Sequence, residues 1–266
     1  MKRSNELTIQ ENCRECVLRN DLFFCQLSDD GIKRFESIKV TRSYPKGRTL
    51  FVEGQPARGV YMLCQGTVKL STCSPDGKII ILDIAEPGEV IGLSAALVDA
   101  DHEMTAEVVE ECQVNYVKTA DLLRFLSEHP RAAINAARQL SRNYRTACHQ
   151  ICAIGLSHSV GDKLAKLFLS WSDHANGNGN GHSIGNGNGN ADHVRIKNAY
   201  THAEMAEMIG TSRETVTRAL RQFREKGLIT LHGSDLVIHD RKRLKAAIGT
   251  RMSPPKEQNN GDDVFS

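Results

Sequence analysis

Short apolar runs alternate with turn-forming residues from about Tyr44 to Tyr116. The runs are TLFV, VYML, TVKL, IIILDI and VNYV, and the segments between them include PKG, EGQPARG, CQG, SPDG and EPGEVIG. Closely spaced short strands with glycine-rich turns are typical of an all-β sandwich or barrel. The pattern therefore predicts a β-roll in which CQG, residues 64–66, forms a turn between two strands.

Helical periodicity lies on both sides of this region. Ser28 can cap a short helix whose apolar side carries Ile32, Phe35 and Ile38. After the roll, apolar positions recur at steps of three or four with Arg and Gln outside them, which predicts one long helix. Such a helix can pack on its own β domain or pair with a second copy, and the narrowness of the stripe favours a parallel dimer seam. The stripe consists of Ile134, Ala137, Leu140, Tyr144, Ala147, Ile151 and Ile154.

The C-terminal third carries the pattern of a winged helix-turn-helix. Thr201 and Glu204 form a capping box that starts one helix, and Gly210 permits the turn after it. Ser212 can cap a second helix with an apolar stripe of its own. The segment GLITLHGSDLVIHD then reads as two short strands, a wing around HGSD. A helix presented in this way is free to enter a DNA major groove.

The polar face of the second helix carries the candidate base-reading residues. An ordinary helical hairpin would spread its charges around the exposed surface, whereas here they gather on the first two exposed turns. Arginine can donate two hydrogen bonds to guanine, and glutamate can accept one from cytosine. We therefore predict a DNA-binding set of Ser212, Arg213, Glu214, Thr217 and Arg218.

Composition limits the picture without assigning a function. The chain has 266 residues, is 40% hydrophobic and 25% charged, and has a formal net charge of +2. This length favours two domains or one domain with an added module, and this charge excludes neither acidic nor basic partners. The N-terminus has no apolar signal region and no run could span a membrane, so we expect a cytoplasmic protein. The Gly/Asn repeat within residues 173–193 is expected to be a flexible surface loop, and the tail from Met252 to be disordered.

Eight cysteines in a reducing compartment favour metal binding or redox chemistry over a disulfide framework. Cys13, Cys16 and Cys25 lie close together in NCRECVLRNDLFFCQL. Clustered thiolates suit an iron–sulfur cluster or an all-cysteine zinc site, and they can also be oxidised directly. Cys64 lies in a predicted strand, where we expect a core position.

The segment TSRETVTRAL resembles the recognition helix of the CRP/FNR family of bacterial transcription regulators. PKGRTLFVEG and PGEVIG are similar to the family's cyclic-nucleotide-binding-type roll, and the resemblance covers roughly residues 22–245. It implies an α+β fold with a jelly-roll-like N-terminal β-roll, a long dimerisation helix and a C-terminal winged helix-turn-helix. The expected division is a Cys-rich arm (1–27), a sensor roll (28–126), the dimerisation helix (127–157), the DNA-binding domain (158–240) and a tail (241–266).

The resemblance also implies a function and partners. The chain would be a homodimeric regulator without enzymatic activity, binding palindromic double-stranded DNA and working with RNA polymerase. The family's cyclic-AMP receptor has the same residue types at the positions of Arg213, Glu214 and Arg218, which implies TGTGA-like half-sites. A rival of another class is a cyclic-nucleotide-like module that regulates an enzyme. The wing opposes this rival, and no catalytic constellation accompanies it.

The segment that would bind the effector differs from the cyclic-nucleotide cassette of the family. Gly88 and Glu89 of the cyclic-nucleotide cassette are present, but Met104, next to Glu103, stands where an arginine is expected. A buried phosphodiester without a counter-charge is costly, so cyclic AMP is disfavoured.

The family's oxygen-sensing branch holds a [4Fe-4S] cluster on four cysteines, which would here be Cys13, Cys16, Cys25 and Cys112. The gap of eight residues before Cys25 exceeds the five usual in that branch. A structural zinc site and direct thiol oxidation remain alternatives.

Overall fold

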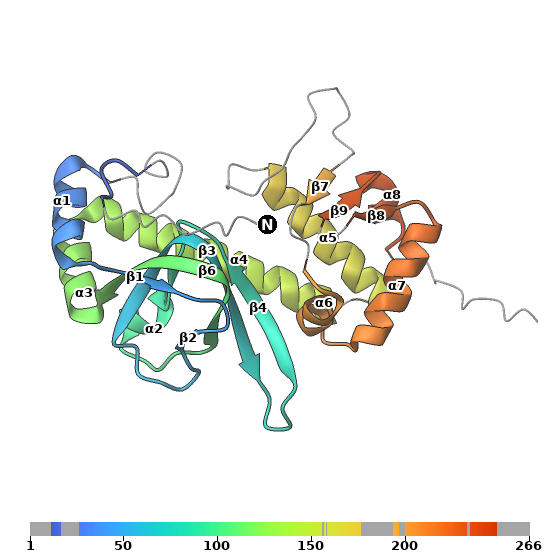
Figure 1. Ribbon diagram of the computed structural model, residues 1–266, viewed down its shortest axis with the longest axis horizontal. Coiled ribbons are helices and arrows are strands. Elements are labelled where there is room, and N and C mark those ends of the chain that lie inside the picture. Colours follow the sequence, from blue (N-terminus) through green and yellow to red (C-terminus); the bar gives the residue numbers. More distant parts are fainter. Residues whose placement is uncertain are drawn as a thin grey trace, which may run out of the picture.

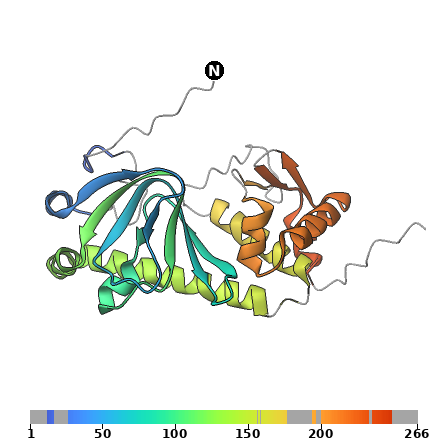
Figure 2. The ribbon, with the colours of Figure 1, turned by 60° about the horizontal axis from the view of Figure 1, so that its bottom comes forward.

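The computed structural model describes residues 12–16, 27–155, 157, 159–176, 194–196, 200–232 and 235–248. A β domain and a helix-rich C-terminal domain are joined by one long helix, which in Figure 2 runs along the underside of the roll. The predicted α+β class is therefore confirmed. Cys25, most of the Gly/Asn repeat and the tail from Met252 lie outside the described residues.

The β-roll is one antiparallel sheet with the strand order β1-β6-β3-β4, in which β2 pairs with β6 and β5 pairs with β3 (Figure 1). Its strands are β1 (Val40–Tyr44), β2 (Thr49–Phe51), β3 (Gly59–Cys73), β4 (Ile79–Ala85), β5 (Val90–Ile91) and β6 (Thr105–Lys118). The helices around it are α1 (Asp29–Ile38), α2 (Leu93–Val98) and α3 (Thr119–Glu128). Ser28 caps α1 as predicted, accepting a hydrogen bond from the Gly31 amide at 3.2 Å.

The predicted turn at residues 64–66 is wrong. The strand β3 continues through these residues, and its register on β6 shifts there: Leu63 lies opposite Val114, and Gln65 lies opposite Gln113. Cys64 is thus the extra residue of a β-bulge, which bends a strand without reversing it. Gly66, with a φ of 82°, follows in a conformation that other residues rarely adopt.

Two apolar clusters fill the β domain. The inner one lies within the roll, and the other lies where the sheet meets the helices. The inner cluster includes Phe51, Leu63, Val68, Val108, Cys112 and Val114. The second includes Phe35, Val60, Met62, Leu122, Phe125, Ala132 and Ala136.

The long helix α4 (Pro130–Gly155) uses two faces. One face packs on the roll, where the Gln139 side chain donates to the Val90 carbonyl at 2.9 Å and accepts from the Val90 amide at 3.0 Å. The other face leaves Ile134, Tyr144 and Ile151 at 49%, 71% and 70% exposure. One face of α4 therefore packs on its own β domain, and the other exposes apolar side chains on which a second copy could pack.

The C-terminal domain has a hydrophobic core to which β4 of the roll also contributes, through Ile81 and the partly buried Ile84. Its elements are α5 (Val160–Asn176), β7 (Val194–Ile196), α6 (His202–Ile209), α7 (Arg213–Glu225), β8 (Ile229–His232), β9 (Asp235–Ile238) and α8 (Arg241–Ala246). The capping box of Thr201 and Glu204 is present, and β8 and β9 pair as the predicted wing. Ile81 of β4 belongs to the same buried cluster as Phe168, Met205 and Phe223.

Candidate nucleic-acid interface and cysteine site

The N-terminal half of α7 presents the predicted base-reading side chains to the outside. Val216, Leu220 and Phe223 fix the opposite side of the helix in the core. The Ser212 hydroxyl caps the helix by accepting from the Thr215 amide at 3.3 Å. The five predicted residues, Ser212, Arg213, Glu214, Thr217 and Arg218, are all exposed on the first turns of α7.

The Thr217 hydroxyl is already engaged within the domain. It donates to the Arg213 carbonyl at 2.9 Å and lies 2.9 Å from the Nδ1 atom of His202 at the start of α6. This contact ties α6 to α7. Sequence reasoning missed His202, because nothing in the pattern of the first helix points across the turn.

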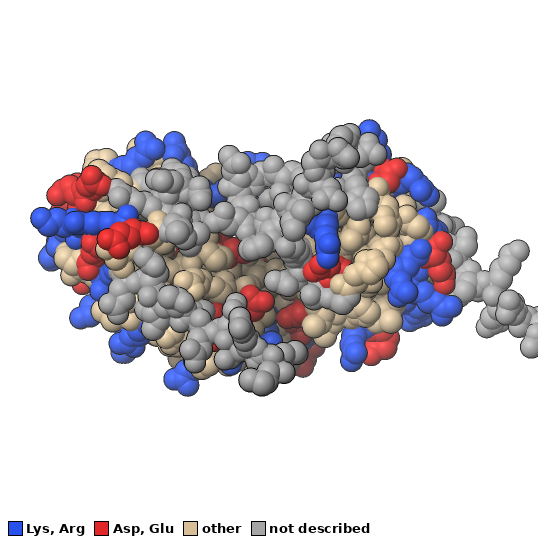
Figure 3. All heavy atoms as spheres, turned by 45° about the horizontal axis from the view of Figure 1, so that its top comes forward, with Lys and Arg blue, Asp and Glu red and all other residues tan. Residues whose placement is uncertain are grey.

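The charges at the start of α7 suit contacts with base edges. The backbone amide of Glu214 and the Ser212 hydroxyl both lower the pKa of the Glu214 carboxyl, so this group is ionised and can accept from cytosine N4. Arg218 has no ion pair or hydrogen bond with any residue that the structure describes. Lys and Arg side chains lie along the outer edge of the C-terminal domain in Figure 3. The helix α8 of this domain carries Arg241, Lys242, Arg243 and Lys245.

In the cassette that resembles a phosphate-binding site, Met104 stands where the resemblance leads one to expect an arginine. Met104 packs against the inner cluster, and Glu103 accepts a hydrogen bond from the Ser94 hydroxyl at 3.1 Å. The half-buried Glu89 carboxyl accepts from the Glu86 amide at 2.9 Å. Burial and the nearby Asp83 carboxylate raise the pKa of Glu89 to about 7. The Asp83 carboxylate and the Arg142 guanidinium thus act on Glu89 in opposite directions.

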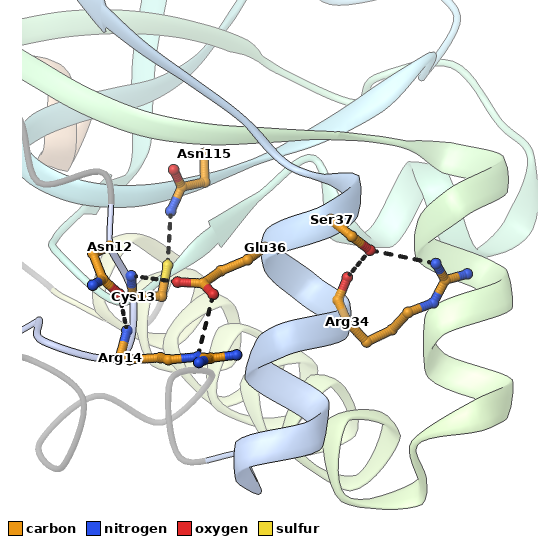
Figure 4. Close-up of polar contacts among 7 residues, drawn as sticks. All are labelled: Asn12, Cys13, Arg14, Arg34, Glu36, Ser37 and Asn115. Atoms are coloured by element: carbon orange, nitrogen blue, oxygen red, sulfur yellow. Dashed lines mark hydrogen bonds and ion pairs between the residues drawn. The ribbon is translucent and has the colours of Figure 1, made fainter.

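Residues 12–16, the described part of the cysteine arm, lie beside α1 and reach Asn115 of the roll (Figure 4). The Cys13 amide donates to the Glu36 carboxylate at 2.9 Å, and Arg14 pairs with the same carboxylate at 3.5 Å. The Asn115 side-chain amide of β6 donates to the Cys13 sulfur at 3.8 Å and to the Cys64 sulfur at 3.2 Å. Lys39 donates to the Asn115 side-chain oxygen at 3.3 Å.

Of the four cysteines predicted to hold a cluster, the structure describes Cys13, Cys16 and Cys112. Cys112 is fully buried in the inner cluster, whereas Cys13 packs against the second cluster. Cys25 lies outside the described residues. Across the parts of the chain that the structure describes, no three His, Cys, Asp or Glu side chains are placed to hold a metal ion.

Burial is the largest influence on the pKa values of the Cys13 and Cys64 thiols. It raises the pKa of Cys13 against the opposing Lys39 ammonium, which is the next largest influence. It raises the pKa of Cys64 to about 12, with further increases from the neighbouring Cys13 and Cys16. Both thiols are therefore protonated at neutral pH, and any metal bound there must displace their protons. The same effects show that Cys16 and Cys64 are electrostatic neighbours.

Two family models match the chain, and together they span both domains. Residues 41–129 match the cyclic nucleotide-binding domain, and residues 162–247 match the Crp-like helix-turn-helix domain. The chain is 27% identical over 201 residues to the CRP-like cAMP-activated global transcriptional regulator of Mycobacterium tuberculosis (strain ATCC 25618 / H37Rv), covering 76% of this chain and 84% of that protein. It is 24% identical over 244 residues to the anaerobic regulatory protein of Bacillus subtilis (strain 168), covering 86% and 92%.

Solved structures agree on the fold. The structure of FixK2 from Bradyrhizobium japonicum matches with a TM-score of 0.64 at 22% identity, covering 79% of this chain and 96% of FixK2. The c-di-GMP-responsive regulator CLP of Xanthomonas campestris matches with a TM-score of 0.65 at 19% identity, covering 80% and 99%. None of the helices within the described ranges has the length and apolar character needed to cross a membrane.

Proposed function

Because the chain belongs to the CRP/FNR family of DNA-binding transcription regulators, we propose that it acts as a homodimer that reads a palindromic site with TGTGA-like half-sites. The observation that carries this proposal is the exposed start of α7, with Arg213, Glu214 and Arg218 on one accessible surface. Arg213 and Arg218 would read guanine and Glu214 would read cytosine, while Ser212 and Thr217 hold the helix end.

The dimer seam proposed here is the exposed apolar face of α4. Ile134, Tyr144 and Ile151 are large apolar side chains that a monomer would leave in water. Parallel pairing of α4 would bury them and would place two copies of α7 on one side of the dimer. Half-sites are then expected about one helical turn apart, near 10 bp between centres. We expect such a dimer to act in the cytoplasm together with RNA polymerase.

The signal proposed here enters through the N-terminal cysteines. Cyclic AMP is disfavoured because Met104 and Glu103 occupy the place of a phosphate-binding cation. Among thiol-based inputs we propose an oxygen-responsive [4Fe-4S] cluster, since such a cluster can be oxidised and can thereby switch the regulator between two states, which a zinc ion cannot do. A structural all-cysteine zinc site and direct thiol oxidation are the alternatives. The thiol chemistry suits a soft metal, but the place of Cys112 disagrees with the predicted set of four.

Two measurements test this function. Selection of binding sites from random DNA should return a palindrome, and fluorescence anisotropy should give tighter binding to it than to shuffled DNA. Recovery of sequences without two-fold symmetry would contradict the homodimeric reading. Protein purified without oxygen should show charge-transfer absorption and contain iron and sulfide. A colourless protein with one zinc per subunit would replace the cluster by a structural site.

A further inference from the structure

We propose that Cys13 and Cys64 form an oxidation site, at which a peroxide joins the cysteine arm to strand β3 by a disulfide bond. This inference concerns the chain without a bound metal, and it deepens the thiol oxidation named above as an alternative input. The two cysteines are far apart in the sequence, but their sulfurs accept hydrogen bonds from the same side chain, Asn115 of β6. A fold that holds two thiols near each other supplies the pair that a disulfide requires.

Both cysteines lie on the same face of the sheet, the face that meets the helices. Along β3, Leu63 belongs to the inner cluster and Met62 to the second cluster. Successive residues of a strand point to opposite faces, so Cys64 shares the face of Met62. The hydrogen bond from Asn115 agrees with this placement, because Asn115 lies opposite Met62 in the register of β3 on β6. Cys13 packs against the same second cluster from the arm, so no layer of the sheet separates the two thiols.

The Asn115 amide limits how far apart the two sulfurs can be. Its nitrogen lies 3.2 Å from the Cys64 sulfur and 3.8 Å from the Cys13 sulfur, so the sulfurs cannot be farther apart than these distances combined. Figure 4 shows this nitrogen pointing at the Cys13 sulfur. The oxygen of the same amide accepts from the Thr41 hydroxyl at 2.8 Å and from the Lys39 ammonium at 3.3 Å. These two donors fix the amide so that its nitrogen, the donor end, faces the sulfurs.

The reduced arm is held near Cys64 by contacts of its own. The Cys13 amide donates to one oxygen of the Glu36 carboxylate at 2.9 Å, and the Arg14 Nε atom lies 3.5 Å from the other oxygen. Two groups held together by the fold react far faster than the same groups meeting from solution. A bond between Cys13 and Cys64 of one chain is therefore favoured over bonds between molecules.

The other described cysteines near the roll are less well placed. Cys112 belongs to the inner cluster on the opposite face of the sheet and is 0% exposed. Cys16 is close enough to raise the pKa values of Cys13 and Cys64, after the larger effect of burial on each. Among the cysteines that the structure describes, however, Cys13 and Cys64 are the pair that shares the Asn115 amide.

Hydrogen peroxide supplies the oxidising equivalents for the bond. The Cys13 thiolate, which burial disfavours and the neighbouring Lys39 ammonium favours, attacks one peroxide oxygen. The O–O bond breaks, Cys13 becomes a sulfenic acid, and the departing hydroxide takes up the proton that Cys13 lost. The Cys64 sulfur then attacks the Cys13 sulfur, and the S–O bond breaks while the Cys64 proton leaves with the hydroxyl group as water. In total the two thiols are oxidised to one disulfide, and the peroxide is reduced to water.

The bond changes how the arm is attached. In the reduced protein, residues 12–16 are held to the roll by hydrogen bonds and one partly exposed ion pair, a kind of contact that contributes little. In the oxidised protein the same segment is covalently joined to β3, beside α1. A thiol reductant reverses the change by exchange, so the attachment is reversible.

Disulfide mapping of the full-length protein tests the assignment. The protein is reduced, freed of metal with a chelator and treated with an equimolar amount of hydrogen peroxide, and the remaining thiols are blocked with iodoacetamide. Trypsin then releases Cys13 in residues 4–14, Cys16 in residues 15–19 and Cys64 in residues 59–69, so each pairing gives a linked peptide of different mass. We expect residues 4–14 linked to residues 59–69, in protein that runs as a monomer on a non-reducing gel. The linked peptide should disappear on treatment with dithiothreitol.

Single substitutions identify the two sulfurs. Cys64→Ser should abolish the linked peptide, whereas Cys16→Ser, the matched control on the arm, should leave its yield unchanged. Cys73→Ser, which removes an exposed cysteine of the same strand β3, should also leave it unchanged. If Cys64→Ser fails to fold by circular dichroism, Cys13→Ser changes only the arm and should give the same loss, with Cys64 recovered as its iodoacetamide adduct after unfolding.

The outcomes separate this inference from the proposed cluster. Linkage of the Cys13 peptide to any cysteine other than Cys64, or linkage found only in protein of dimer mass, would overturn the assignment. Iron and sulfide in protein purified without oxygen, with no Cys13–Cys64 peptide after metal removal and oxidation, would support the cluster and overturn this inference. A colourless protein that yields the Cys13–Cys64 peptide would overturn the cluster and support the oxidation site.

Discussion

Arg218 offers the sharpest test of how this protein reads DNA. Its side chain is exposed and makes no ion pair or hydrogen bond with the residues that the structure describes. Arg218→Ala should therefore change the free energy of unfolding by no more than about 0.5 kcal/mol, as for other surface substitutions. A lost bidentate contact with guanine costs about 1–3 kcal/mol, which corresponds to a loss of about 5–150-fold in affinity for the selected site.

The matched control is Arg221→Ala on the same helix. Arg221 pairs with Glu225 at 2.8 Å, one turn further on, and both side chains are well exposed. This change should cost about 0.5 kcal/mol of helix stability and leave sequence preference intact.

Fluorescence anisotropy at fixed salt, on the selected palindrome and on a shuffled duplex, measures both variants. Arg218→Ala should lose affinity for the palindrome only, and preference should relax at one base pair of each half-site. An equal loss on both duplexes, with a shallower salt dependence, would show that Arg218 contacts phosphate and would refute the base-reading argument.

Three further predictions concern the proposed dimer seam, Glu89 of the cassette, and the hydrogen bonds by which Gln139 joins α4 to the roll. Ile151→Asp should shift the monomer–dimer equilibrium by more than about tenfold in sedimentation experiments, because burying an isoleucine contributes about 2 kcal/mol on each subunit; an unchanged dimer would contradict the α4 seam. Burial raises the pKa of Glu89 from 4.5 to about 7, so the folded state holds this proton more tightly than the unfolded chain. Stability should thus be full below pH 4.5 and fall by about 2 kcal/mol as the pH rises through 7, allowing for partial solvent access. Glu89→Gln should flatten that slope in urea titrations, and a parallel curve would show that another group titrates. Gln139→Ala should cost about 2 kcal/mol by leaving the buried Val90 amide and carbonyl unpaired; a melting temperature equal to that of the parent would argue that the clamp contributes nothing.

Local chemistry made much of the fold predictable. Capping by Ser28, Thr201 and Ser212 depends on a few neighbouring residues, and each cap is where the sequence pattern predicts it. The α7 stripe is similarly local, because its buried and exposed sides follow directly from helical spacing. Fold class and the accessible position of the candidate base readers could thus be predicted before any tertiary contact was known.

What could not be predicted depends on pairing between distant segments. A glycine with preceding polar residues predicts a turn, and only the register against β6 makes residues 64–66 a bulge. The same register decides that Cys64 faces the arm while Cys112 faces the inner cluster. The helix α3, between the roll and α4, was also missed. The amphipathic pattern of α3, in which Leu122 and Phe125 are buried, is short and follows directly after β6. The sequence alone therefore does not separate this helix from the strand.

Ile81 links the folding of the two domains. This β4 residue is 1% exposed and sits in the cluster that also contains Phe168, Met205 and Phe223 of the C-terminal domain. A strand of the roll thus completes the hydrophobic interior of the domain that carries the recognition helix. The C-terminal domain produced alone would expose an apolar hollow to water, and heating the whole chain should melt both domains in one transition. The β-roll is therefore part of the folding unit of the domain that carries α7.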